Sequence, residues 1–154
     1  MQHLLHRFLT HHFPGFTALK HHVPLLGVLM LLLLFANPVA AQLVINEVDY
    51  DQAGTDTAEF LEIKNTGGSS VNLSTYTIEL VSGGSAYNTI PLPAVSLAAG
   101  DYFVVCANAA TVANCDLDES PDTNFIQNGA PDAIGLKDGS SLVDALSYEG
   151  DSAP

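Results

Sequence analysis

The chain has 154 residues, with 17 acidic residues against four basic ones and a formal net charge of −13 at pH 7. A domain this acidic cannot neutralise a polyanion, which excludes nucleic acid and anionic lipid as partners of the domain alone. Only two cysteines are present, and no C-x₂-C motif exists, so a structural zinc site is also excluded.

Residues 1–41 have the pattern of a secretory signal peptide. They hold Arg7, Lys20 and all six histidines but no acid, and an apolar run from Val23 to Phe35 precedes small residues at 39–41. A cationic start, an apolar segment of this length and a small-residue exit are typical of a cleaved leader, whereas a membrane span needs about 20 apolar residues.

We therefore expect residues 1–41 to be a signal helix that is removed on export. Membrane attachment would arise only through an uncleaved signal segment. The mature protein is expected to be extracellular, periplasmic or at the cell surface. After cleavage, 17 acids face only Lys64 and Lys137, so the net charge becomes −15.

Residues 42–151 have the size of one domain, and residues 152–154 form a linker-like end. Short apolar runs separated by Gly, Asn, Asp and Pro predict an all-β fold. The strands expected, in chain order, are 43–48, 58–65, 71–81, 87–92, 102–107, a short one around Phe125-Ile126, 132–137 and 141–148. About eight strands in one domain favour an antiparallel sandwich of two sheets.

Three of these runs carry further information. Pro91 and Pro93 confine the strand at 87–92 to a sheet edge or a bulge. The run from Tyr102 to Ala107 lacks alternation, which predicts burial on both faces. Asp138-Gly139 between two apolar runs predicts a hairpin.

Cys106 and Cys115 form the even cysteine count expected of a disulfide in an exported protein. Closing a loop of about ten residues stabilises the fold by about 2.5–3 kcal/mol in the chain-entropy model. Two free thiols are the alternative.

The loop between the first two strands is the candidate calcium site, with Asp49, Asp51, Asp56 and Glu59 as its ligands. Calcium takes six to eight oxygen ligands at closely spaced positions. The loop departs from the EF-hand pattern, so we expect at most a weak site; a solvated turn is the alternative. A second acidic group, from Asp116 to Asp122, is a weaker candidate, and Glu47 and Glu62 are expected to be structural.

The residues beyond position 41 exclude most catalytic chemistry. They contain no histidine, which rules out a Ser-His-Asp or Cys-His arrangement, and no arginine to clamp a phosphate. A pair of carboxylates could in principle hydrolyse a glycoside, but such enzymes need a large cleft. We therefore expect no enzymatic activity, no catalytic residue and no cofactor apart from the weak calcium site.

Six segments together resemble the lamin-tail domain (LTD) family in its bacterial exported form. The segments are INEV at 45–48, EFLEIKN at 59–65, VNLSTYTI at 71–78, LAAGDYFVV at 97–105, NGAPDAIGLKD at 128–138 and VDALSY at 143–148. The resemblance covers residues 43–150 and implies an immunoglobulin-like β-sandwich.

The resemblance also implies a non-catalytic role in attachment or domain organisation. Because the sequence has a leader and lacks a coiled-coil rod, the nuclear role of lamins does not transfer. The predicted function is a secreted binding or spacer module for an unknown protein or cell-surface partner. The alternative is the amino-terminal accessory domain of a longer extracellular nuclease, phosphatase or other hydrolase, which the gene sequence beyond Pro154 would reveal.

Overall fold

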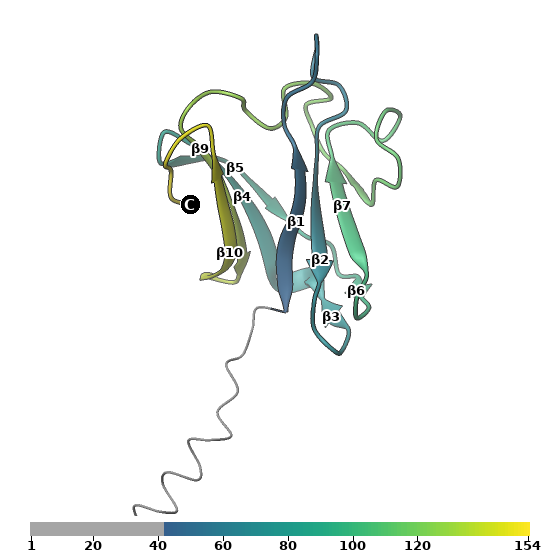
Figure 1. Ribbon diagram of the computed structural model, residues 1–154. Coiled ribbons are helices and arrows are strands. Elements are labelled where there is room, and N and C mark those ends of the chain that lie inside the picture. The colour runs from purple at the N-terminus through teal and green to yellow at the C-terminus, as the bar shows by residue number, and fades with distance from the viewer. Residues whose placement is uncertain (1–41) are drawn as a thin grey trace, which may run out of the picture. The chain divides into compact units, whose positions relative to one another are not determined.

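The computed structural model describes residues 42–154, so the predicted signal segment lies outside the described residues. This part of the chain is all-β, with one short 3₁₀ helix (Figure 1). The elements are β1 (Leu43–Asp49), β2 (Phe60–Asn65), β3 (Val71–Asn72), the 3₁₀ helix η1 (Leu73–Thr75), β4 (Tyr76–Ser82), β5 (Ser85–Pro91), β6 (Ser96–Leu97), β7 (Tyr102–Cys106), β8 (Leu117–Asp118), β9 (Asp132–Asp138) and β10 (Ser141–Tyr148).

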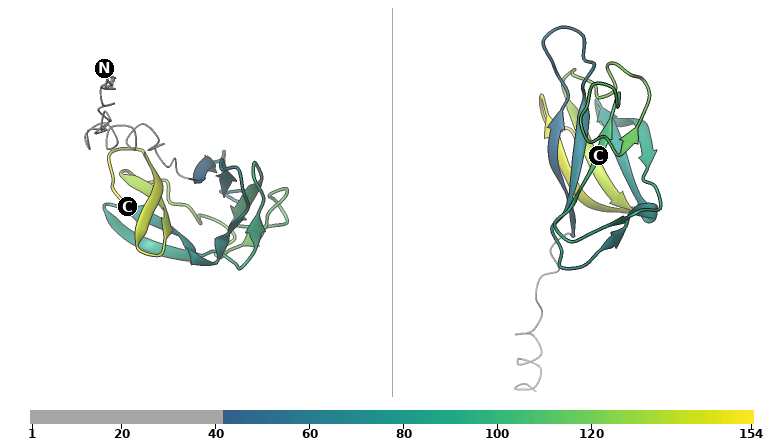
Figure 2. Two further views of the ribbon diagram at one scale, coloured as in Figure 1. Left: turned by 90° about the horizontal axis from the view of Figure 1, so that it is seen from below. Right: turned by 90° about the vertical axis from the view of Figure 1, so that its right-hand side faces the viewer.

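Two four-stranded sheets face each other. The first has the strand order β1-β2-β7-β8 and the second has the order β10-β9-β4-β5, while β3 and β6 form a small separate pair. All pairings are antiparallel except that of β7 with β8. The left panel of Figure 2 views the two sheets from one end, as the two sides of the sandwich. The predicted immunoglobulin-like sandwich is therefore confirmed.

The core lies between the sheets and is made by alternate residues of each strand. Leu61 and Ile63 on β2 are fully buried, as are Ile78 and Leu80 on β4. Their intervening neighbours are partly exposed, because successive strand side chains point to opposite faces. This alternation is why the main strands can be predicted from the sequence.

The structure corrects three sequence predictions. The run 71–81 is two strands rather than one, because Asn72 accepts a hydrogen bond from the Ser74 N–H at 2.9 Å and starts η1. The strand expected around Phe125-Ile126 is wrong, since this segment is a buried loop whose N–H groups bind a side chain. The short strands β6 and β8 were not predicted.

Other strand predictions are confirmed. β5 is an edge strand, as its prolines require. β7 is buried on both faces from Phe103 to Cys106, and β9 and β10 form the predicted hairpin. Among residues 42–154, no helix is long and apolar enough to cross a membrane.

The edge strands β1 and β10 are joined by a side chain. The backbone N–H of Ile45 on β1 donates to Oδ2 of Asp144 on β10 at 2.8 Å. Asp144 lies opposite the core residue Leu136 of β9, after a bulge in β10, so its carboxylate points inward at the sheet edge. An inward charge at an edge strand discourages pairing with another chain.

Asn65, at the end of β2, connects the segments around residues 67, 69 and 97 at one end of the sandwich. Its fully buried side chain donates to the carbonyls of Ser69 (2.9 Å) and Leu97 (3.0 Å). The same side chain accepts a hydrogen bond from the Gly67 N–H at 2.9 Å. An amide fits here because both its donor and acceptor ends are used.

Asn65→Ala should therefore lower the free energy of unfolding by about 2–4 kcal/mol, since it leaves buried backbone groups unpaired. Asn72→Ala is the matched control, because its side chain caps a single exposed N–H, and its cost should be about 1 kcal/mol or less. Urea unfolding of both variants measures the difference, and equal losses would contradict the role given to Asn65.

Candidate functional site

The loop between β1 and β2 does not gather its acids around one point. Among residues 42–154, no group of three or more acidic, histidine or cysteine side chains is arranged to hold a metal ion. Glu59 and Asp56 are buried, whereas Asp51 is exposed. Asp49 Oδ1 accepts a hydrogen bond from the Gln52 side chain at 2.8 Å.

The two buried acids of this loop already accept backbone hydrogen bonds. Oδ1 of Asp56 takes the Gln52 N–H at 2.8 Å. The Glu59 carboxylate takes the N–H groups of Phe125 at 2.5 Å and Ile126 at 3.2 Å. Calcium binding at this loop stays a prediction, and it would have to compete with these N–H groups.

Melting curves with and without millimolar calcium test this site. A calcium ion bound only to the folded state would raise the midpoint of melting. An unchanged midpoint would show that calcium does not bind the folded domain. If the midpoint rises, a smaller rise in the variant Asp51→Asn, which changes the exposed acid of the loop, identifies the loop as the calcium site.

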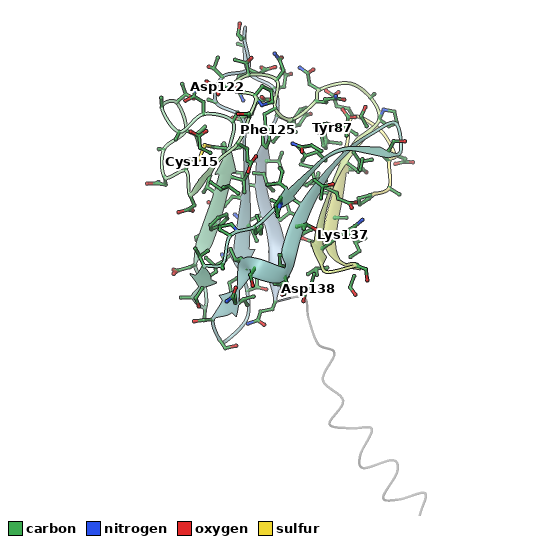
Figure 3. The ribbon with its side chains drawn as sticks, turned by 180° about the vertical axis from the view of Figure 1, so that it is seen from behind. Tyr87, Cys115, Asp122, Phe125, Lys137 and Asp138 are labelled. Atoms are coloured by element: carbon green, nitrogen blue, oxygen red, sulfur yellow. A yellow bond between two sulfur atoms is a disulfide. The ribbon has the colours of Figure 1, made fainter. Side chains whose placement is uncertain are left out.

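The loop that crosses the end of the sandwich, residues 119–131, is held by polar side chains from both sheets. Phe125 and Ile126 are buried at the top of the core, and Figure 3 shows Phe125 there with Tyr87 on the neighbouring sheet. Tyr87 accepts a hydrogen bond from the Gln127 N–H, and Tyr148 donates its hydroxyl to the Gln127 carbonyl, each at 3.0 Å.

Asp132, at the start of β9, completes this arrangement. It is fully buried, and its Oδ2 accepts the Gly129 N–H at 3.0 Å. Burial raises the pKa of the Tyr87 and Tyr148 hydroxyls, and the negative charge of Asp132 adds to both increases. Both tyrosines therefore stay protonated at neutral pH. Tyr87, Tyr148 and Asp132 have a structural role, since they hold the loop of residues 119–131 in place.

The disulfide predicted between Cys106 and Cys115 is confirmed, with the Cα atoms 5.8 Å apart. It holds the loop after β7 over the outer face of the first sheet. Val112 of this loop is buried against Val104 and Cys106, and these three residues form a small second core. This loop explains why β7 is buried on its outer side as well.

A groove of about 750 Å³ lies beside this loop, on the outer face of β1, β2 and β7. Its floor is apolar and includes Ala58, Phe60 and Val104, and the loop from Thr111 to Asp116 forms one wall. Four carboxylates line the groove, those of Glu47, Asp49, Glu62 and Asp116. The volume lies in the range typical of ligand sites.

A β-bulge at Asn46 determines which acids face the groove. Ile45 pairs with Ile63, but the next pair is Glu47 with Glu62, so Asn46 is the extra residue in β1. In a regular ladder without the bulge, Asn46 would pair with Glu62 and Glu47 would lie opposite the core residue Leu61. With the bulge, Glu47 and Asp49 turn outward. Bulges often redirect side chains at functional sites.

Neither lysine of residues 42–154 forms an ion pair with a carboxylate of the groove. Lys137 pairs with Glu79 on the other sheet. Lys64 Nζ lies 2.8 Å from the Tyr102 hydroxyl and 4.7 Å from the centre of its ring. Within the described part of the chain, Lys64 forms no ion pair with the groove carboxylates.

The sequence prediction named Cys106, Cys115 and the loop acids as site residues, but the groove was not predicted. Of the predicted site residues, Asp49 and Cys115 line it, and so does Asp116 of the second acidic group. Glu47 and Glu62 were expected to be structural, and they lie on its surface. A signal was available in β1, where the core-facing apolar residues stand at 43 and 45 and then at 48 and 50, a change of phase that marks the bulge.

Glu59 should make stability depend on pH. Burial raises the pKa of the Glu59 carboxyl, and the charges of Asp56 and Asp49 raise it further, although the N–H groups of Phe125 and Ile126 oppose the rise. An acid whose pKa is higher in the folded state binds its proton more tightly there. The protonated Glu59 side chain contributes fully to stability below the pKa that Glu59 has in the unfolded protein. This contribution is lost as pH rises through the pKa that Glu59 has in the folded protein.

Glu59→Gln cannot ionise, so the wild type should lose stability relative to this variant as pH rises above about 4.3, the ordinary glutamate value. Urea unfolding across pH 4–8 measures the difference. Glu149→Gln removes one charge from an exposed position and should run parallel to the wild type. Parallel curves for Glu59→Gln as well would contradict the buried position of its charge.

Comparison with known proteins identifies the family of the chain. A search of curated proteins finds no match to the chain. The family model of the Lamin Tail Domain matches residues 36–150, which include every strand described above. This family is one of immunoglobulin-like binding and structural domains. The chain belongs to the lamin tail domain family.

Proposed function

We propose that this protein is an exported, non-catalytic binding and spacer module that serves attachment or domain organisation. The family membership supports a binding or structural domain. The single observation that favours binding over simple spacing is the groove on the outer face of the first sheet. A spacer needs no concave surface, whereas ligand-binding sites are typically concave.

The distribution of carboxylates supports a role without catalysis. Glycoside hydrolysis uses one carboxyl as an acid and a second as a base or nucleophile in the same cleft. Burial raises the pKa of the Glu59 carboxyl, but its oxygens bind backbone N–H groups inside the fold. Glu59 does not line the groove, so it cannot act as the acid on a substrate bound there.

The export proposal is supported by the disulfide, because disulfides persist in oxidising compartments and are rare in the cytosol. It is also supported by the composition of residues 1–41. An acidic surface of net charge −15 keeps such a domain soluble and selects cationic or neutral partners.

This function is tested by fractionation, mass spectrometry and activity assays on the protein as its host produces it. We expect the protein in the exported fraction, beginning at Gln42 by mass spectrometry and without free thiols. The same material should not hydrolyse DNA, a phosphomonoester or an oligosaccharide above the buffer rate. Cytosolic location with an intact leader would contradict export, and turnover that follows the protein through purification would contradict the non-catalytic role.

A further inference from the structure

We propose that the outer-face groove binds an extended polypeptide segment that carries lysine or arginine side chains. This inference rests on the proposed binding function and names the chemistry of the partner. It is carried by three features of the groove: its opposed carboxylates, its apolar floor and the lack, within residues 42–154, of any lysine that forms an ion pair with these carboxylates.

The opposed carboxylates are Glu47 and Glu62, which face each other directly across β1 and β2. Like charges at directly opposite positions destabilise a sheet. Asn46 relieves part of this cost, since its side-chain amide donates to Oε1 of Glu62 at 2.7 Å. Glu47 has no hydrogen-bond partner among residues 42–154, so one carboxylate of the pair is available to a ligand.

The other two carboxylates lie at different places along the groove. Asp49 is opposite Phe60, one outward position beyond the Glu47–Glu62 pair. Asp116 directly follows Cys115, and its Oδ2 accepts the Val104 N–H at 2.9 Å. The four acids are spread over β1, β2 and the segment after Cys115, and none of the described residues form a metal-binding group. Several cations spaced along one chain fit this spread better than a single ion.

The floor explains why side chains of lysine or arginine are favoured. Phe60 and Val104 present apolar surface beneath the acidic walls. Lysine and arginine combine an aliphatic stem with a charged head, so the stem can cover the floor while the head reaches a carboxylate. Lys64 already shows this arrangement beside the groove, lying over the Tyr102 ring. An acidic or nucleic-acid ligand would meet four like charges here.

The experiment measures binding of fluorescein-labelled decapeptides to the purified chain by fluorescence anisotropy. One peptide alternates lysine with valine, and its counterpart alternates glutamate with valine. We expect the lysine peptide to bind and to weaken as salt rises from 20 to 150 mM, because exposed charges are screened over about 8 Å at the higher concentration. The glutamate peptide should not bind.

The double variant Glu47→Gln and Glu62→Gln should weaken binding of the lysine peptide by tenfold or more. The matched control is Asp138→Asn with Asp151→Asn, which removes the same charge from exposed positions outside the groove. Its affinity should stay within twofold of the wild type. The groove variant should melt no lower than the wild type without peptide, since it removes the opposed like charges.

Equal weakening by the two double variants would overturn the inference, because binding would then follow net charge rather than the groove. Failure of the lysine peptide to bind the wild type would also overturn it. Neither result depends on the export and activity measurements described above. The proposal of a cationic partner can therefore be wrong while the proposed non-catalytic role is right.

Discussion

The buried carboxylate of Glu59 is the interaction on which the upper end of this sandwich depends. It lies just before β2 and binds the N–H groups of Phe125 and Ile126, far along the chain. These two residues then complete the core between the sheets. A buried loop needs partners for its backbone groups, and here one side chain supplies two of them. The raised pKa of Glu59 reflects the cost of burying that charge.

Two groups of acids in this domain therefore have different physical roles. Glu59, Asp56 and Asp132 point inward and bind backbone N–H groups of loops. A second group lies on the outer face of the first sheet, where the Asn46 bulge and the disulfide-closed loop shape a groove around it. Net charge alone cannot separate the two groups.

The sequence was sufficient for the sandwich, the hairpin of β9 and β10 and the disulfide, because these follow from local patterns and cysteine pairing. It failed where distant residues decide the structure. Phe125-Ile126 has the residues of a strand, but the Glu59 carboxylate takes the N–H groups that a neighbouring strand would need. The groove was not predicted because the bulge at Asn46 changes which face Glu47 occupies, and the phase shift it causes in β1, with core residues at 43 and 45 and then at 48 and 50, was not used.

Amide hydrogen exchange at neutral pH tests the central claim, that a buried glutamate makes the loop of residues 119–131 part of the core. We expect the Phe125 and Ile126 amides to be protected to the same degree as those of β7, exchanging only when the domain unfolds globally. Exchange of these two amides at the rate of an open loop, with β7 still protected, would contradict it.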